Sequence, residues 1–157
     1  MQEMRRKDRL TSEEAAWEIL RDCHYAVVAM LDAEGGAPYA IPVSPALVGR
    51  AVYFHCADKG QKINNILADN RVCISCVAEC ETDAPGLTER YRSCVAMAKA
   101  HIVENPEEKK QALREITRKY APEFMDKAER CIEKTLNQTG IVRLDVEQIS
   151  GKQSKRP

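Results

Sequence analysis

The spacing of apolar residues changes along the chain, and each change separates predicted helices from predicted strands. After Thr11 the apolar residues recur every three or four positions, which predicts an amphipathic helix. The same spacing returns in residues 59–68, and again after Asn105-Pro106, a dipeptide typical of a helix start. Pro122 interrupts this last stretch, so the pattern predicts four helices in all.

Between these helices lie apolar or alternating segments typical of strands. The predicted strands are residues 25–31, 37–47, 51–57, 71–78, 90–103 and 139–149. The first two are joined by Asp-Ala-Glu-Gly-Gly, whose glycines allow the positive φ angles of a hairpin turn. Residues 80–90 are polar and contain Pro85-Gly86, so we expect a long loop there, with 81–90 as a candidate lid over a substrate.

The order of these elements favours antiparallel pairing, because an early hairpin and runs of consecutive strands do not fit a doubly wound arrangement. We therefore expect a mostly β (α+β) fold, a small antiparallel barrel with helices packed outside. Residues 1–150 are expected to form one domain, and 151–157 a polar C-terminal tail.

The composition narrows the class of protein. The 157 residues include 24 Lys+Arg and 24 Asp+Glu, so the net charge is zero and no nucleic-acid partner is expected. The longest apolar run, residues 25–31, is far shorter than the ~20 residues of a membrane helix, so we expect no membrane partner. The N-terminus lacks the apolar core of a signal peptide, and seven scattered cysteines suit reduced thiols, so we expect a cytoplasmic protein.

Three of the cysteines, Cys73, Cys76 and Cys80, resemble a metal site in their spacing. Their surroundings are β-branched and apolar, which predicts a strand. On a strand Cys73 and Cys76 point to opposite faces, and Cys76 and Cys80 stand roughly 13 Å apart. Neither pair can then share a zinc ion with bonds of about 2.3 Å. Core-filling thiols are the better interpretation, and we expect no metal.

The most informative segment runs from the end of a predicted strand into a helix start at Gly60-Gln61-Lys62. Unpaired backbone N–H groups at a helix start attract anions, and phosphate above all. Gly60 permits close approach, while Lys59 and Lys62 supply full charges. The alternative is that both lysines are only solvated surface. The segment lacks the Walker pattern, and the chain has no GxGxxG for a Rossmann dinucleotide.

A set of segments along the chain resembles one family. They are MRRKDR (4–9), GGAPYAIPVS (35–44), VYFHCADKGQKINNI (52–66), YRSCVAMAKAHIV (91–103), EEKKQALREITRKYAP (107–122) and ISGK (149–152). In this order the set is similar to the pyridoxamine 5′-phosphate oxidase-like FMN-binding split β-barrels, in the branch of 5-nitroimidazole resistance proteins. The resemblance covers nearly the whole chain.

The resemblance implies a six-stranded split barrel and a homodimer with FMN at the subunit interface. The flavin ring would lie along residues 39–44, and Ser93 would reach the flavin of the partner subunit. Lys62 and the backbone near Gly60 would hold the phosphate, and His55 would donate a proton during turnover. The implied cofactor-binding residues are Tyr39, Ile41, Pro42, Val43, Ser44, His55, Cys56, Gly60, Gln61, Lys62 and Ser93.

Two departures from the family pattern refine this expectation. The oxidases carry Arg where this chain has Gln61, so one guanidinium is missing from the phosphate clamp, and Arg5, Arg6 or Lys59 would compensate. The terminal Arg-rich substrate motif is also absent, so we expect no oxidation of pyridoxamine phosphate.

The leading hypothesis is an FMN-dependent oxidoreductase that reduces a small organic acceptor such as a nitroaromatic.

Two alternatives stay open from the sequence. One is a dimer that binds or senses FMN without turnover. The other is a haem-binding split barrel in which His24 or His55 ligates the iron.

Overall fold

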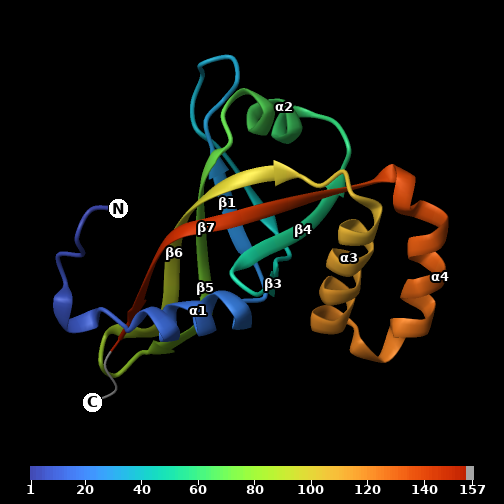
Figure 1. The fold of residues 1–157 in the computed structure, drawn as a ribbon. Coiled ribbons are helices and arrows are strands. Elements are labelled where there is room, and N and C mark those ends of the chain that lie inside the picture. The colour runs from blue at the N-terminus through green and yellow to red at the C-terminus, as the bar shows by residue number, and fades with distance from the viewer. Residues whose placement is uncertain (155–157) are drawn as a thin grey trace.

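The computed structural model describes residues 1–154, which contain one seven-stranded sheet in the order β2-β1-β5-β6-β7-β4-β3 (Figure 1). The strands are β1 (Ala26–Met30), β2 (Tyr39–Val43), β3 (Ala46–Val48), β4 (Ala51–Ala57), β5 (Arg71–Asp83), β6 (Thr88–Ile102) and β7 (Thr139–Gln153). The helices are α1 (Glu13–Asp22), α2 (Gln61–Ala68), α3 (Pro106–Tyr120) and α4 (Met125–Thr135), with short 3₁₀ turns at Lys7–Arg9, Pro122–Phe124 and Leu136–Gln138.

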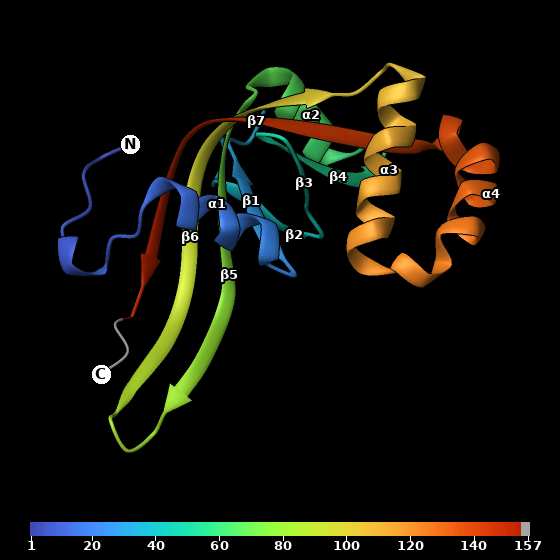
Figure 2. The ribbon, with the colours of Figure 1, turned by 60° about the horizontal axis from the view of Figure 1, so that its bottom comes forward.

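The two edge strands of the sheet, β2 and β3, follow one another in the sequence. All strand pairs are antiparallel, and only Ser44 and Pro45 join one edge of the sheet to the other. The sheet must therefore curl until its edges approach each other at this corner, which gives a half-open barrel (Figure 2). The predicted antiparallel barrel is confirmed. It has seven strands rather than six, because Ser44 and Pro45 break the predicted second strand into β2 and β3.

The main core fills the inner side of the barrel. Two helices contribute to it, with Ile19 and Leu20 from α1 and Ile63 and Ile66 from α2. Inward-pointing strand residues complete it: Val28, Met30, Val52, Phe54, Val72, Ile74, Cys76, Cys94, Ala96, Ala98, Ala100, Val142 and Leu144. A smaller cluster of Val103, Ala112 and Ile141 lies on the opposite side of β7, under α3. Helices thus cover different faces of the sheet.

The segment predicted as a loop and lid, residues 80–90, is a β-hairpin instead. β5 continues to Asp83 and β6 begins at Thr88, so only a four-residue turn separates them. Cross-strand polar pairs hold the hairpin, among them Arg90 with Asp83 at 3.0 Å and Arg92 with Glu79 at 2.7 Å. These residues are polar because the hairpin projects from the barrel into solvent (Figure 2). The prediction of a loop was wrong because it took this polarity as evidence against a strand.

The last strand runs further than the sequence pattern predicts. β7 continues through Gln153, three residues past the predicted domain end, and Gly151 is buried. A Cβ at Gly151 would lie 2.2 Å from Thr11 Oγ1 and 2.9 Å from Ala16 Cβ, so α1 packs directly on this position. Residues 151–153 therefore belong to the barrel. Residues 155–157 of the predicted tail lie outside the described residues.

The clustered cysteines occupy β5 as a strand, as their surroundings predict. Cys76 is buried, whereas Cys73 on the other face is half-buried. Cys76 Sγ lies 3.3 Å from Sγ of Cys94, its cross-strand partner on β6. Among residues 1–154, no group of three or more His, Cys, Asp or Glu side chains has the arrangement of a metal site.

The C-terminal end of α3 fixes the corner between the two edge strands. Lys119 Nζ donates hydrogen bonds of 2.7 Å to the carbonyl oxygens of both Cys23 and Pro45. The Tyr120 hydroxyl lies 2.9 Å from the carbonyl oxygens of His24 and Pro45. Burial lowers the pKa of Lys119. One helix end thus fastens the Pro45 corner to the segment before β1.

Replacing Lys119 by Met should open this corner. The change keeps the aliphatic stem but removes a charged donor from two carbonyls, which should lower the free energy of unfolding by about 1–3 kcal/mol. Urea unfolding followed by circular dichroism measures this. Arg118→Met, on the neighbouring exposed residue, is the matched control, and equal midpoints for both variants would contradict the assigned role.

Candidate functional site: the split between the edge strands

The start of α2 follows the end of β4, where residues 54–57 pair with β7 but have no partner on the β3 side. Gly60 is the residue before the helix, at φ +112°, a conformation that glycine adopts most readily. Its carbonyl accepts from the N–H groups of Ile63 and Asn64 at 2.9 and 3.1 Å. The N–H groups of Gln61 and Lys62 precede the first helical hydrogen bond and are left for another acceptor. A Cβ built at Gly60 would meet nothing within 4 Å, so the space beside the helix start is open.

Lys62 reaches from α2 to the end of β4. Its Nζ lies 6.0 Å from the centre of the Phe54 ring, and the same ammonium interacts with the Cys56 thiol. Burial raises the pKa of Cys56, and nearby Lys62 offsets this only in part. Cys56 is therefore a neutral thiol at neutral pH rather than a nucleophile. The pair offers one positive charge beside an apolar wall.

Strand β2 supplies the other border of the split. Tyr39, Ile41 and Val43 pack against the same core cluster as Cys56, so these side chains share the inner side of the sheet. Ala40 and Pro42 point outward and are exposed. Proline in a sheet is confined to positions where no ladder N–H is needed, and the edge position of Pro42 meets this condition. The outer edge of β2 is thus open to a ligand along its backbone.

His55 lies on the other side of β4 from Cys56. Successive strand residues point to opposite faces, and Val52 and Phe54 are buried on the inner side. His55 shares its face with Tyr53, whose hydroxyl donates to Glu108 of α3 at 3.0 Å. Within one protomer the structure therefore brings Cys56 and Lys62 together at the split and turns the exposed His55 toward the α3 side.

Ser93 lies far from the helix start within one protomer. It pairs with Lys152 on β7, whereas His55 pairs with Ile141, eleven residues earlier on the same strand. At ~3.3 Å per residue this is roughly 36 Å of strand. Ser93 therefore lies far along the curled sheet from the end of β4 that Lys62 approaches.

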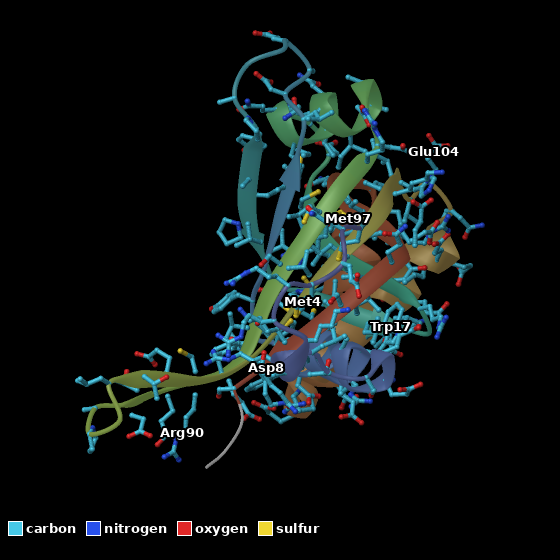
Figure 3. The ribbon with its side chains drawn as sticks, turned by 90° about the vertical axis from the view of Figure 1, so that its left-hand side faces the viewer. Met4, Asp8, Trp17, Arg90, Met97 and Glu104 are labelled. Atoms are coloured by element: carbon cyan, nitrogen blue, oxygen red, sulfur yellow. The ribbon has the colours of Figure 1, made fainter. Side chains whose placement is uncertain are left out.

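The outward face of β1, β2, β5 and β6 is apolar and uncovered, which the sequence analysis did not predict. Tyr25, Val27 and Val77 are exposed by 60%, 42% and 50%. Beside them a shallow pocket of about 430 Å³ is lined by residues that include Cys73 and Met97. Met97 lies near the middle of this part of the sheet (Figure 3). The signal was present in the sequence, because strands such as AVVAM and VCISCVA are almost wholly apolar, as strands covered on both faces are.

Comparisons with known proteins identify the fold. The family model described as pyridoxamine 5′-phosphate oxidase matches residues 12–153, which is most of the chain. The protein belongs to the pyridoxamine 5′-phosphate oxidase family. The matched range spans both borders of the split and extends to the last residue of β7. The resemblance read from the sequence is thereby confirmed at the level of the family.

Solved structures share the architecture of this pyridoxamine 5′-phosphate oxidase family member. A Bacteroides thetaiotaomicron protein assigned to 5-nitroimidazole antibiotic resistance is 24% identical, with a TM-score of 0.72, over 91% of this chain and 85% of that one. The flavocytochrome Anf3 from Azotobacter vinelandii is 20% identical, with a TM-score of 0.81, over 99% and 73%. An FAD and haem binding protein from Mycobacterium smegmatis is 21% identical, with a TM-score of 0.73, over 93% and 73%. At these identities the likeness shows the fold.

No curated protein matches the sequence significantly. In residues 1–154, the structure contains no helix with the length and apolar character needed to span a membrane.

Proposed function

We propose that this member of the pyridoxamine 5′-phosphate oxidase family binds FMN in the split and passes electrons from it to a small organic acceptor such as a nitroaromatic. The observation that carries the proposal is the open helix start at Gly60, with Lys62 and Cys56 beside it, in a chain of this family. Known proteins with this fold bind flavins: the Mycobacterium smegmatis protein binds FAD and haem, and the Azotobacter vinelandii protein is a flavocytochrome.

The residues at the helix start fit a phosphate group. The free N–H groups of Gln61 and Lys62 and the positive end of α2 attract an anion, and the ammonium of Lys62 adds a full charge. The open space beside Gly60 leaves room for phosphate oxygens to approach the backbone. Gln61 adds an amide where the oxidases have a guanidinium, so a single charged side chain, Lys62, carries most of the affinity here.

The border along β2 fits the flavin ring. Its edge backbone can donate and accept hydrogen bonds, while Tyr39, Ile41 and Val43 make the wall behind it apolar and dry. FMN, when bound, supplies the hydride and electron chemistry. The chain itself orients the ring, excludes water and sets the local charge. Because His55 faces the α3 side of β4 and not the split of its own protomer, we propose that it holds the proton delivered to the acceptor at the flavin of the partner subunit.

Two copies of the chain would complete this site. The exposed apolar residues of β1, β2, β5 and β6 form one continuous outward face, and such patches are typical of protein interfaces. Ser93 lies on β6 of this face, far along the curled sheet from Lys62 of its own chain. A homodimer built on this face would cover the apolar strands and bring Ser93 toward the flavin of the partner subunit.

The proposed phosphate contact predicts the effect of Lys62→Gln on flavin affinity. Loss of a charge-assisted hydrogen bond should weaken FMN binding by about 1.5–3 kcal/mol, roughly 10- to 150-fold. Riboflavin, which lacks the phosphate, should bind both proteins almost equally. Fluorescence titration of the purified protein measures both ligands, and Lys134→Gln on exposed α4 is the matched control. FMN affinity that is unchanged in Lys62→Gln would remove Lys62 from the site.

Electron transfer and the role of His55 are tested in one anaerobic experiment. The flavin absorbance at about 450 nm is bleached with dithionite, and a 5-nitroimidazole is then added. Recovery of the absorbance is expected in the native protein and should be roughly a hundredfold slower in His55→Ala, because a general acid is lost. No recovery in the native protein would favour the carrier or sensor, and a Soret band would favour haem. Equal rates would remove His55 from the mechanism.

The outward face predicts the oligomeric state. Val27→Asp places a charge in the middle of the exposed apolar strands, so it should convert a dimer into monomers at micromolar concentration. Sedimentation equilibrium measures this. Phe124→Asp is the matched control, because Phe124 is also exposed, by 53%, but precedes α4 away from this face. A native monomer, or a dimer that survives Val27→Asp, would contradict the proposed interface.

A further inference from the structure

Three polar side chains meet at the hairpin end of the outward face. Arg9 from the N-terminal segment donates from Nη1 to the hydroxyl of Tyr91 on β6 at 3.1 Å, and its Cζ lies 5.9 Å from the centre of that ring. Lys152 of β7 places its Nζ 5.6 Å from the same ring. Nitrogen-tipped side chains gather in this area beside Asp8, below Met97 (Figure 3). Two cations therefore share one phenol.

In the described part of the chain these two cations form no direct ion pair, unlike their neighbours. Arg6 pairs with Asp8 at 2.7 Å, and Lys99 pairs with Glu147 at 3.1 Å. Within residues 1–154, neither Arg9 nor Lys152 forms an ion pair with a carboxylate. Both are only partly exposed, so water does not fully solvate them. The ring of Tyr91 offsets part of their repulsion but leaves most of their N–H groups free.

The cluster is held by backbone contacts rather than by flexible side chains alone. Thr11 N–H donates to Gly151 O at 3.1 Å, which ties the N-terminal segment to β7 next to Lys152. Tyr91 N–H donates to Ser154 Oγ at 3.0 Å, and Ser154 N–H donates to the carbonyl oxygen of Tyr91 at 3.0 Å. Three separate segments of the chain are thus fixed around one point before any ligand arrives.

The excess positive charge affects the pKa of the Tyr91 phenol. Partial burial would raise the pKa of Tyr91, but the hydrogen bonds and charges of Arg9 and Lys152 outweigh burial, so the pKa of Tyr91 lies below its usual value. A bound anion would neutralise this charge and return the pKa of Tyr91 toward its ordinary range.

We propose that Arg9, Tyr91 and Lys152 form a binding site for a phosphate monoester. A phosphate dianion matches the two uncompensated charges, and its oxygens can accept from a guanidinium, an ammonium and a phenol at once. The site lies at the rim of the outward face, well away from Lys62 of the same chain. The phosphate can come from the flavin held by a second copy or from a separate phosphorylated small molecule.

The test compares ribose 5-phosphate with ribose, which differ only in the phosphate, by calorimetry on the full chain freed of flavin. Ribose 5-phosphate should bind, and Arg9→Gln and Lys152→Gln should each weaken it by about tenfold or more. Arg71→Gln and Lys99→Gln are matched controls, because their charges are already paired with Asp69 and Glu147, and should bind as the native protein does. Equal binding of both sugars, or a loss caused by Lys62→Gln instead, would overturn the site.

A second measurement separates the two sources of phosphate. If the flavin supplies it, Arg9→Gln and Lys152→Gln should lower FMN affinity while riboflavin affinity stays constant. If a separate molecule supplies it, FMN affinity is unchanged and only ribose 5-phosphate binding falls.

Absorbance titration of the tyrosines, with Tyr91→Phe as reference, gives an independent readout. Phosphate, but not chloride at equal ionic strength, should shift the Tyr91 titration to higher pH. No shift would contradict the site. This measurement does not require that flavin bind, so it fails or succeeds independently of the proposed function.

Discussion

The barrel depends on one constraint, which is that the chain must pass directly from one edge of its sheet to the other. Pro45 lies at this crossing, and its carbonyl oxygen is held by Lys119 and approached by Tyr120. The same two side chains bind the backbone of Cys23 and His24 just before β1. The end of α3 therefore fixes the distance between the edge strands at one end of the barrel.

Positive and negative charges are unevenly distributed over the protein, although the net charge is zero. Most cations on the surface lie beside a carboxylate, as Arg71 does with Asp69 and Arg114 with Glu129. Lys62 instead faces the neutral thiol of Cys56 and an aromatic ring. Local excess of positive charge, rather than net charge, marks the places where this protein can hold an anion.

Much of the fold follows from local sequence signals. The bounds of β4 match the prediction, and so does the end of α2 at Ala68. The helix begins at Gln61 rather than at the predicted residue 59, because Gly60 precedes it at a positive φ angle. The hairpin of β5 and β6 was missed because a strand exposed on both faces has the composition of a loop. The extension of β7 was missed because glycine usually indicates a turn. Gly151 instead leaves room for Ala16 of α1, which packs directly on it.

The candidate site was predictable only in part. Adjacent residues on a strand point to opposite faces, so the predicted strand already implied that His55 and Cys56 could not both face the same side. Which of the two faces the split depends on the register of β4 with β7, and that is a long-range property. The Arg9, Tyr91 and Lys152 cluster joins segments more than sixty residues apart, so no local pattern could have indicated it.

The sulfur atoms of the core have a consequence for how this fold withstands oxidants. A hydrogen bond with Cys23 lowers the pKa of Cys76, but contact with Cys94 and burial outweigh it and raise that pKa to about 12. The contact with Cys76 and burial likewise raise the pKa of Cys23 far above its usual range. Oxidation proceeds through the thiolate, which is almost absent here at neutral pH. The thiols at the centre of the barrel are thus protected from oxidation, although Cys76 and Cys94 lie in contact with one another.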